Sequence, residues 1–185
     1  MSKINSKQKG SRFERVVCKV FSKWTGFEFQ RVPQSGGLRW KKADNITSDV
    51  TCTDPRHGRR CLISIECKSY QDIRFEHILL QNKSCKILSF WEQAYGDANR
   101  ANKVPFLVMH YNGMPKEEAF VMVNNSTAKL MLSQGKLTKP RMAIQWNNYE
   151  QSEDVLYVFM LSDLINLDYR VLHKELRKLH KASNK

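Results

Sequence analysis

Three charged side chains interrupt the hydrophobic pattern of two short segments, and their types suit a metal site. Asp49 lies in Ser-Asp-Val-Thr-Cys (48–52), and Glu66 and Lys68 lie in Leu-Ile-Ser-Ile-Glu-Cys-Lys (62–68). Carboxylates and ammonium groups among apolar residues are costly unless they pair, bind a metal or face a cleft. Two carboxylates with a backbone carbonyl and waters suit a hard divalent cation such as Mg²⁺.

Both segments show the alternation of β-strands, which decides the side chains that share a face. Residues 53–60 between them contain Pro, Gly and charges, which predicts an antiparallel hairpin of 48–52 with 61–67. Asp49 and Glu66 would then lie on one face of neighbouring strands, close enough to bind one metal ion. Lys68 would point into the same cleft, where it could orient or deprotonate an attacking water.

A helix is predicted just before these strands. Apolar residues recur at helical spacing from Phe13 to Phe21, which indicates a helix over 11–24. Ser11 is the expected N-cap, and Glu14 then falls in the first turn. The helix dipole favours a negative charge there, so Glu14 has a structural interpretation as well as a functional one.

The order Glu14, Asp49, then Glu66-Cys67-Lys68 resembles the PD-(D/E)XK nuclease superfamily, and within it the archaeal and phage Holliday-junction resolvases. Ser48 stands where the name of the motif has Pro. The resemblance extends over about the first 110 residues. Without that context, an exposed ion pair on a strand is the favoured interpretation of Glu66 and Lys68.

The resemblance implies a set of roles for these residues. Asp49, Glu66 and the backbone carbonyl of Cys67 would bind Mg²⁺, with Mn²⁺ as a substitute, and Glu14 would complete the acidic cluster. Ser35, in a Ser-Gly step, resembles a loop serine that contributes to cleavage in the archaeal enzymes; an ordinary basic loop is the alternative. The predicted catalytic residues are Glu14, Ser35, Asp49, Glu66 and Lys68.

Basic residues outnumber acidic residues, and several of them lie in the loop at 31–42. The chain has 31 Lys and Arg against 18 Asp and Glu, a net charge of +13. Such an excess favours a polyanionic partner, and no apolar run approaches the ~18 residues that a membrane span needs. We therefore expect DNA and no membrane. The predicted DNA contacts are Lys9, Arg12, Arg31, Arg39, Trp40, Lys41 and Lys42, which combine phosphate contacts with base stacking.

Five cysteines without a Cys-X-X-Cys pair predict reduced, buried thiols and a cytoplasmic protein. With 185 residues, 41% of them apolar, the chain has enough material for one domain with a substantial core.

The remaining patterns predict alternating strands and helices. A strand over 27–32 precedes the hairpin, and a helix over 87–95 crosses to a buried strand at 104–111, parallel to the Glu66 strand. Tyr70 and Gln93 are expected to line the site, with a core or edge aromatic and a solvent-facing amide as the alternatives. After residue 113 we expect strands at 119–123, 142–146 and 155–160, with helices at 126–133 and from Ser162 onwards.

The predicted fold is therefore α/β, a restriction-endonuclease-like mixed central sheet flanked by helices. Residues 1–113 would form the nuclease core and 114–185 a C-terminal β-α extension of the same domain. The predicted function is a metal-dependent, structure-selective DNA endonuclease, a Holliday-junction resolvase acting as a homodimer and encoded by a phage. The alternatives are a restriction-like or nicking endonuclease on duplex DNA, and a non-catalytic nucleic-acid-binding module of the same fold.

Overall fold

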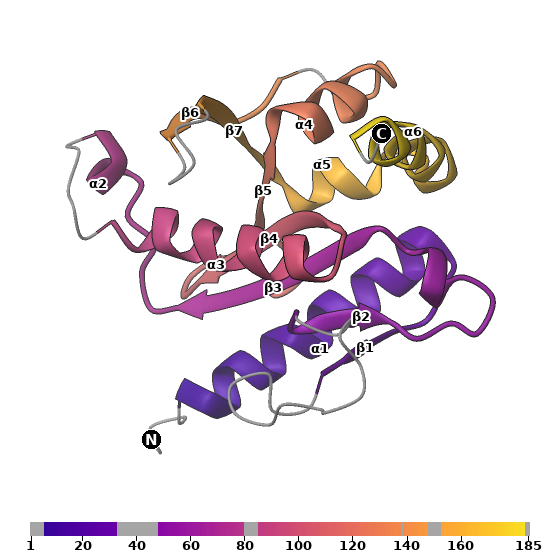
Figure 1. Cartoon of the computed structure of the whole chain (residues 1–185). Coiled ribbons are helices and arrows are strands. Elements are labelled where there is room, and N and C mark those ends of the chain that lie inside the picture. The colour runs from indigo at the N-terminus through magenta and orange to yellow at the C-terminus, as the bar shows by residue number, and fades with distance from the viewer. Residues whose placement is uncertain (1–5, 33–47, 80–84, 138, 148–152, 184–185) are drawn as a thin grey trace.

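The computed structural model describes residues 6–32, 48–79, 85–137, 139–147 and 153–183. Within these residues the strands form one mixed seven-stranded sheet, in the order β1-β2-β3-β4-β5-β7-β6 (Figure 1). Their bounds are β1 Phe29–Arg31, β2 Val50–Cys52, β3 Ile63–Tyr70, β4 Val104–Tyr111, β5 Phe120–Asn124, β6 Met142–Asn147 and β7 Glu153–Met160.

The register of β2, β3 and β4 confirms the predicted pairing around the site. β2 is antiparallel to β3, with Val50 opposite Ile65. β4 is parallel to β3 over its full length, from Ile63 opposite Val104 to Tyr70 opposite Tyr111. The helix α3 (Lys86–Arg100) lies between these two strands in the chain and forms the crossover that a parallel pair requires.

Helices cover both faces of the sheet (Figure 1). One face packs against α1, α4, α5 and α6, and the other against α3. None of the helices in the described ranges is both long enough and apolar enough to cross a membrane. The helix bounds are α1 Ser6–Thr25, α2 Glu76–Leu79, α3 Lys86–Arg100, α4 Asn125–Leu132, α5 Leu161–Ile165 and α6 Tyr169–Ser183.

The central strand β4 separates two hydrophobic cores. Phe106 and Val108 belong to the core beneath α1, whereas Leu107 and Met109 belong to the core beneath α3. Both faces of β4 are therefore buried, which explains its near-continuous apolar sequence. The predicted α/β fold with a mixed, helix-flanked sheet is confirmed.

The first helix begins five residues earlier than predicted, so the prediction of an N-cap at Ser11 was wrong. α1 starts at Ser6, and Ser11 lies inside it, where its hydroxyl accepts a hydrogen bond from Arg31 Nη2 at 3.0 Å. Gly10 weakens this extra turn by about 1 kcal/mol, but the flanking Lys and Gln residues favour helix. Glu14 consequently lies beyond the first turn, and the dipole interpretation of its position fails.

The C-terminal helix is divided in two, so the prediction of one continuous helix was also wrong. The break comes between α5 and α6, where Leu167 turns into the core and its carbonyl accepts the Trp24 indole N–H at 2.9 Å. The Asp168 carboxylate then accepts the backbone N–H groups of Arg170 and Val171, at 2.8 and 3.3 Å. Asp168 therefore caps the N-terminus of α6, which begins as a separate helix.

The strands after residue 113 continue the central sheet, because β5 pairs with β4 and β7 pairs with β5. The division into a core over 1–113 and an extension over 114–185 stays a prediction. All five cysteines are buried free thiols, as the sequence predicts.

Candidate active site

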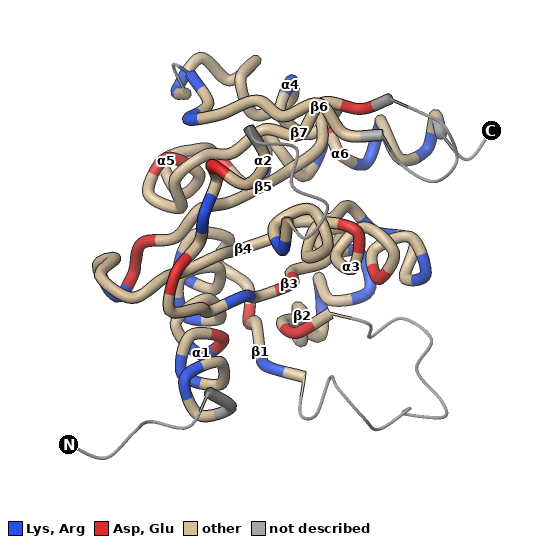
Figure 2. The backbone as a smooth tube through the Cα atoms, turned by 90° about the vertical axis from the view of Figure 1, so that its left-hand side faces the viewer, with Lys and Arg blue, Asp and Glu red and all other residues tan. Residues whose placement is uncertain are grey.

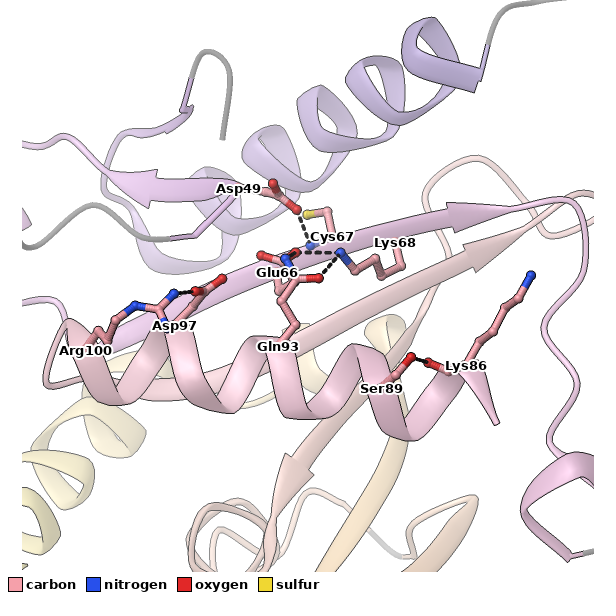
Figure 3. A network of polar contacts seen from close by, with 9 residues as sticks. All are labelled: Asp49, Glu66, Cys67, Lys68, Lys86, Ser89, Gln93, Asp97 and Arg100. Atoms are coloured by element: carbon pink, nitrogen blue, oxygen red, sulfur yellow. Dashed lines mark hydrogen bonds and ion pairs between the residues drawn. The ribbon is translucent and has the colours of Figure 1, made fainter. Parts of the chain in front are cut away.

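Glu66, Lys68 and Gln93 form a closed set of hydrogen bonds between β3 and α3 (Figure 3). Lys68 Nζ donates to Glu66 Oε1 at 2.7 Å and to Gln93 Oε1 at 2.9 Å. Gln93 Nε2 donates to the same Glu66 oxygen at 2.8 Å. Strand alternation places Glu66 and Lys68 on one face, and this is the face that α3 covers. Gln93 therefore contacts both charged side chains of the site, although the residue as a whole is exposed.

Asp49 reaches the same point from the residue before β2 (Figure 3). Its Oδ2 accepts the backbone N–H of Cys67 at 3.0 Å, and the residue is only 8% exposed. The N–H and C=O of a strand residue point toward the same neighbouring strand. The Cys67 carbonyl therefore also points to the side of Asp49, so that the oxygens expected to bind metal lie together.

Burial and a like charge shape the ionisation of Glu66. Burial makes the largest contribution and raises the Glu66 pKa. The Asp49 carboxylate raises it further and Lys68 lowers it, so that the pKa lies at about 8. Two carboxylates held close together in a desolvated place repel each other when both are ionised. A cation bound between them would relieve that repulsion.

Lys68 stays positively charged at neutral pH. Burial acts to lower its pKa, but the Glu66 carboxylate and its hydrogen bond outweigh that effect and raise the pKa above the ordinary 10.5. A protonated amine cannot accept a proton from water. The raised pKa thus favours orientation and charge stabilisation by Lys68 over its alternative role as a base.

Asp97 is a buried carboxylate beside this site, close enough to affect the Glu66 pKa, that the sequence analysis missed. It lies one helical turn after Gln93, is 7% exposed, and pairs with Arg100 (Figure 3). Burial raises the pKa of Asp97, Arg100 lowers it, and Asp49 raises it, while Asp97 in turn raises the pKa of Glu66. The signal was present in the sequence, because side chains four residues apart on a helix share a face.

Glu14 lies on α1, on the other side of the sheet from α3. Its carboxylate accepts a hydrogen bond from Arg31 Nε at 2.5 Å, and its charge reaches the Cys67 thiol, whose pKa it helps to raise. Within the described ranges, no three acidic, His or Cys side chains converge as a set of metal ligands. Glu14 is thus tied to a guanidinium rather than joined to Asp49 and Glu66, and its place in the metal cluster stays a prediction.

The donor set at Asp49, Glu66 and the Cys67 carbonyl fits a hard divalent cation. All three donors are oxygens, which Mg²⁺ and Mn²⁺ prefer. Two protein carboxylates are sufficient for Mg²⁺, since it keeps several waters and binds substrate phosphates as well. When bound, such an ion polarises a phosphoryl oxygen and lowers the pKa of a coordinated water.

Comparison with known proteins finds a family and a relative. A family model described as "Phage putative PDDEXK endonuclease" matches residues 5–172. The chain belongs to this family. It is also 26% identical to Protein D14 of Escherichia phage T5 over 105 residues, which are 57% of this chain and 64% of that protein. The chain thus spans less than two thirds of this relative, and no solved structure matches it.

Membership of this phage PDDEXK endonuclease family confirms the predicted superfamily and supports nuclease activity. The substrate of a nuclease is nucleic acid, and PDDEXK nucleases generally use divalent metals. The family match covers α1, the site strands and α3 in one span.

The predicted DNA contacts of this PDDEXK protein lie partly on α1. Figure 2 shows Lys and Arg recurring along that helix, where Arg12 is exposed and Lys9 donates to the Tyr70 carbonyl at 2.6 Å. Arg31 is engaged with Glu14 and Ser11. The remaining predicted residues lie outside the described ranges and stay predictions, namely Ser35, Arg39, Trp40, Lys41 and Lys42.

Proposed function

We propose that this chain is a metal-dependent, structure-selective DNA endonuclease, and within that class a Holliday-junction resolvase. The observation that carries the nuclease proposal is the meeting of Asp49, the Cys67 backbone and Glu66, with Lys68 bound to Glu66 on the same face. A surface that only binds nucleic acid has no need to bury two carboxylates among so many basic residues. The order of the acidic residues, which resembles that of the resolvases, supports the finer assignment.

The proposed mechanism gives each side chain one task. Asp49, Glu66 and the Cys67 carbonyl would hold Mg²⁺ or Mn²⁺, which would polarise a phosphoryl oxygen and activate a water. Lys68 stabilises the charge that develops on the phosphoryl oxygens, because its ammonium group is already held in place before the reaction. Gln93 holds the Glu66 carboxylate and the Lys68 ammonium in position by hydrogen bonds, as the partners of metal ligands do in other proteins.

The proposed substrate determines the proposed assembly. A four-way junction presents two equivalent strands for cleavage, so two active sites related by a two-fold axis suit it. We therefore propose a homodimer that acts on branched DNA in the cytoplasm of the phage host.

The test compares DNA substrates of identical sequence and different shape. The full chain is incubated with four-way junction, flap, nicked and linear duplex DNA in Mg²⁺ or in Mn²⁺, and the products are mapped. We expect symmetric cuts near the junction centre and far slower cleavage of linear duplex. Equal cleavage of junction and duplex would instead identify a restriction-like or nicking enzyme, and no product with either metal would identify a binding module.

Two variants test the site separately from the substrate. Asp49→Asn and Glu66→Gln each remove one carboxylate charge with little change in shape, so both are expected to abolish cleavage while junction binding persists. The matched control is Asp163→Asn. Asp163 lies on α5 and its carboxylate is paired with Arg141, so this variant should cut normally. Cleavage by either site variant at the normal rate would show that the metal is held elsewhere.

A further inference from the structure

A pocket of about 530 Å³ lies next to the catalytic face of β3, beyond Lys68. Its lining includes two aromatic rings and several charged or polar side chains, namely Tyr70, Phe90, Lys86, Asp72, Arg74 and His77. The volume is in the range of small-molecule binding sites. Nothing in the mechanism above uses this pocket.

Two aromatic rings connect the pocket to the catalytic lysine. Lys68 Nζ lies over the Phe90 ring, 5.5 Å from its centre, and Phe90 contacts Tyr70 with ring centres 4.8 Å apart. Tyr70 is 37% exposed, which makes it one of the few large hydrophobic side chains at the described surface that is not covered. An exposed tyrosine supported from behind by a second ring provides a surface on which a flat ligand can stack.

Basic groups surround this aromatic platform. Lys86 is exposed and its Nζ lies over the Tyr70 ring at 5.8 Å, a position that it can leave because its side chain is flexible. Lys9 donates to the Tyr70 carbonyl, and Arg74, which is paired with Asp72, also lines the pocket. Cations around a stacking surface are the combination that binds the phosphates and bases of single-stranded nucleic acid.

The position of Tyr70 on the strand sets its distance from the cut. Glu66, Lys68 and Tyr70 alternate onto one face of β3, and four residues of strand span about 13 Å. Roughly four stacked nucleotides cover the same distance at about 3.4 Å each. This spacing allows one DNA strand to place a phosphate at Glu66 and a base at the pocket.

We propose that this pocket binds an unpaired base of the DNA strand that is being cut, a few nucleotides from the scissile phosphate, by stacking on Tyr70. The proposal rests on the nuclease function above and adds a reason for its selectivity. A base inside duplex DNA must leave its stack and its partner to reach Tyr70, whereas a base in a single strand is already unpaired. A four-way junction is fully paired, but the pairs at its centre open more easily than those inside a duplex, so a base there reaches the pocket at a lower cost. The pocket would therefore favour branched substrates over linear duplex.

The test measures binding of short single-stranded DNA that carries a fluorescent adenine analogue, in EDTA so that no cleavage occurs. With the full chain we expect the fluorescence of the analogue to change on binding, because stacking on Tyr70 changes the surroundings of the base. Tyr70→Ala should weaken binding roughly 5- to 150-fold, the range for loss of one stacked base. Tyr70→Phe keeps the ring and should bind as the unmodified protein does.

Two further variants separate stacking from charge and from general damage. Tyr111 is opposite Tyr70 on β4 but does not line the pocket, so Tyr111→Ala should leave binding unchanged. Lys86→Glu should weaken binding and make its salt dependence shallower, because one phosphate contact is lost. Circular dichroism confirms that each variant is folded.

The outcomes distinguish this proposal from the proposed function. If Tyr70→Ala binds single strands as tightly as the unmodified chain, or if Tyr111→Ala weakens binding equally, the pocket is not a base site, whatever the cleavage assay shows. If binding depends on Tyr70 but no DNA is cut in any metal, the base site stands and the nuclease proposal fails.

Discussion

The side-chain amide of Gln93 on α3 donates a 2.8 Å hydrogen bond to the Glu66 carboxylate on β3. The Gln93 side-chain oxygen accepts a hydrogen bond from the Lys68 ammonium at 2.9 Å, so one neutral side chain contacts both charged groups and holds them in position. Neither charged group could keep this geometry by itself, because each has a long side chain with several rotamers.

Gln93→Ala should lower the cleavage rate about 10- to 100-fold, the usual cost of losing a partner of a metal ligand. Stability should change by less than about 1 kcal/mol, since Gln93 lies at the helix surface. Single-turnover cleavage and urea denaturation measure the two quantities. Asn99→Ala, at an exposed position of the same helix, serves as the control and should cut normally. A Gln93→Ala enzyme with unchanged rate would mean that Lys68 needs no support from α3.

The affinity for divalent metal should depend on pH through Glu66. The Glu66 pKa lies at about 8, raised by burial and by Asp49, so metal binding below that pH must first displace a proton. We expect the affinity for Mg²⁺ to fall about tenfold for each pH unit below 8 and to level off above it. Isothermal titration calorimetry in buffers of different ionisation enthalpy measures both the affinity and the proton release.

A change at Asp97 tests the origin of that pH dependence. Asp97→Asn removes a charge that raises the Glu66 pKa, so the affinity curve should move to lower pH. An unchanged curve would mean that Asp49 and burial alone determine the ionisation of Glu66.

The metal-free protein should lose stability as the pH rises toward 8. The Glu66 pKa is about 8 in the folded state and near the ordinary 4.5 in the unfolded chain. Between these values the folded state keeps a proton that the unfolded chain has released, so its stability is highest at the acidic end of the window and falls as the pH rises. Urea denaturation in EDTA across this window measures the slope.

Glu66→Gln is the matched variant for that experiment, because it cannot ionise. Its stability should decline less steeply over the same pH range than that of the unmodified chain. Equal slopes would show that Glu66 does not titrate in this window.

The helix that supplies Gln93 and Asp97 is anchored by Trp91. This side chain is fully buried and contacts Trp146 edge-on, with ring centres 6.1 Å apart. Trp91→Ala should reduce the free energy of unfolding by about 3–5 kcal/mol, the typical cost of removing a buried aromatic ring. Val171→Ala, at a side chain that is 45% exposed, should change it by less than about 0.5 kcal/mol. Thermal denaturation of the two variants gives the comparison, and similar losses would place Trp91 outside the core.

The sequence by itself determined the strands of the site and the faces of their side chains. Alternation along 62–68 put Glu66 and Lys68 on one face, and the turn residues before them predicted the hairpin that brings Asp49 close. These features are local, because the side-chain period of a strand and the chemistry of a turn depend on neighbouring residues. The apolar run of β4 likewise indicated a strand buried on both faces.

Only the tertiary structure decided what surrounds that pair. Gln93 and Asp97 share a helical face in any folded context, but the packing of α3 on the sheet decides that this face meets Glu66. The contact with Arg31 likewise determines where Glu14 points, and the burial of Leu167 divides the last helix. These outcomes depend on contacts between residues far apart in the chain, whose energies no local pattern encodes.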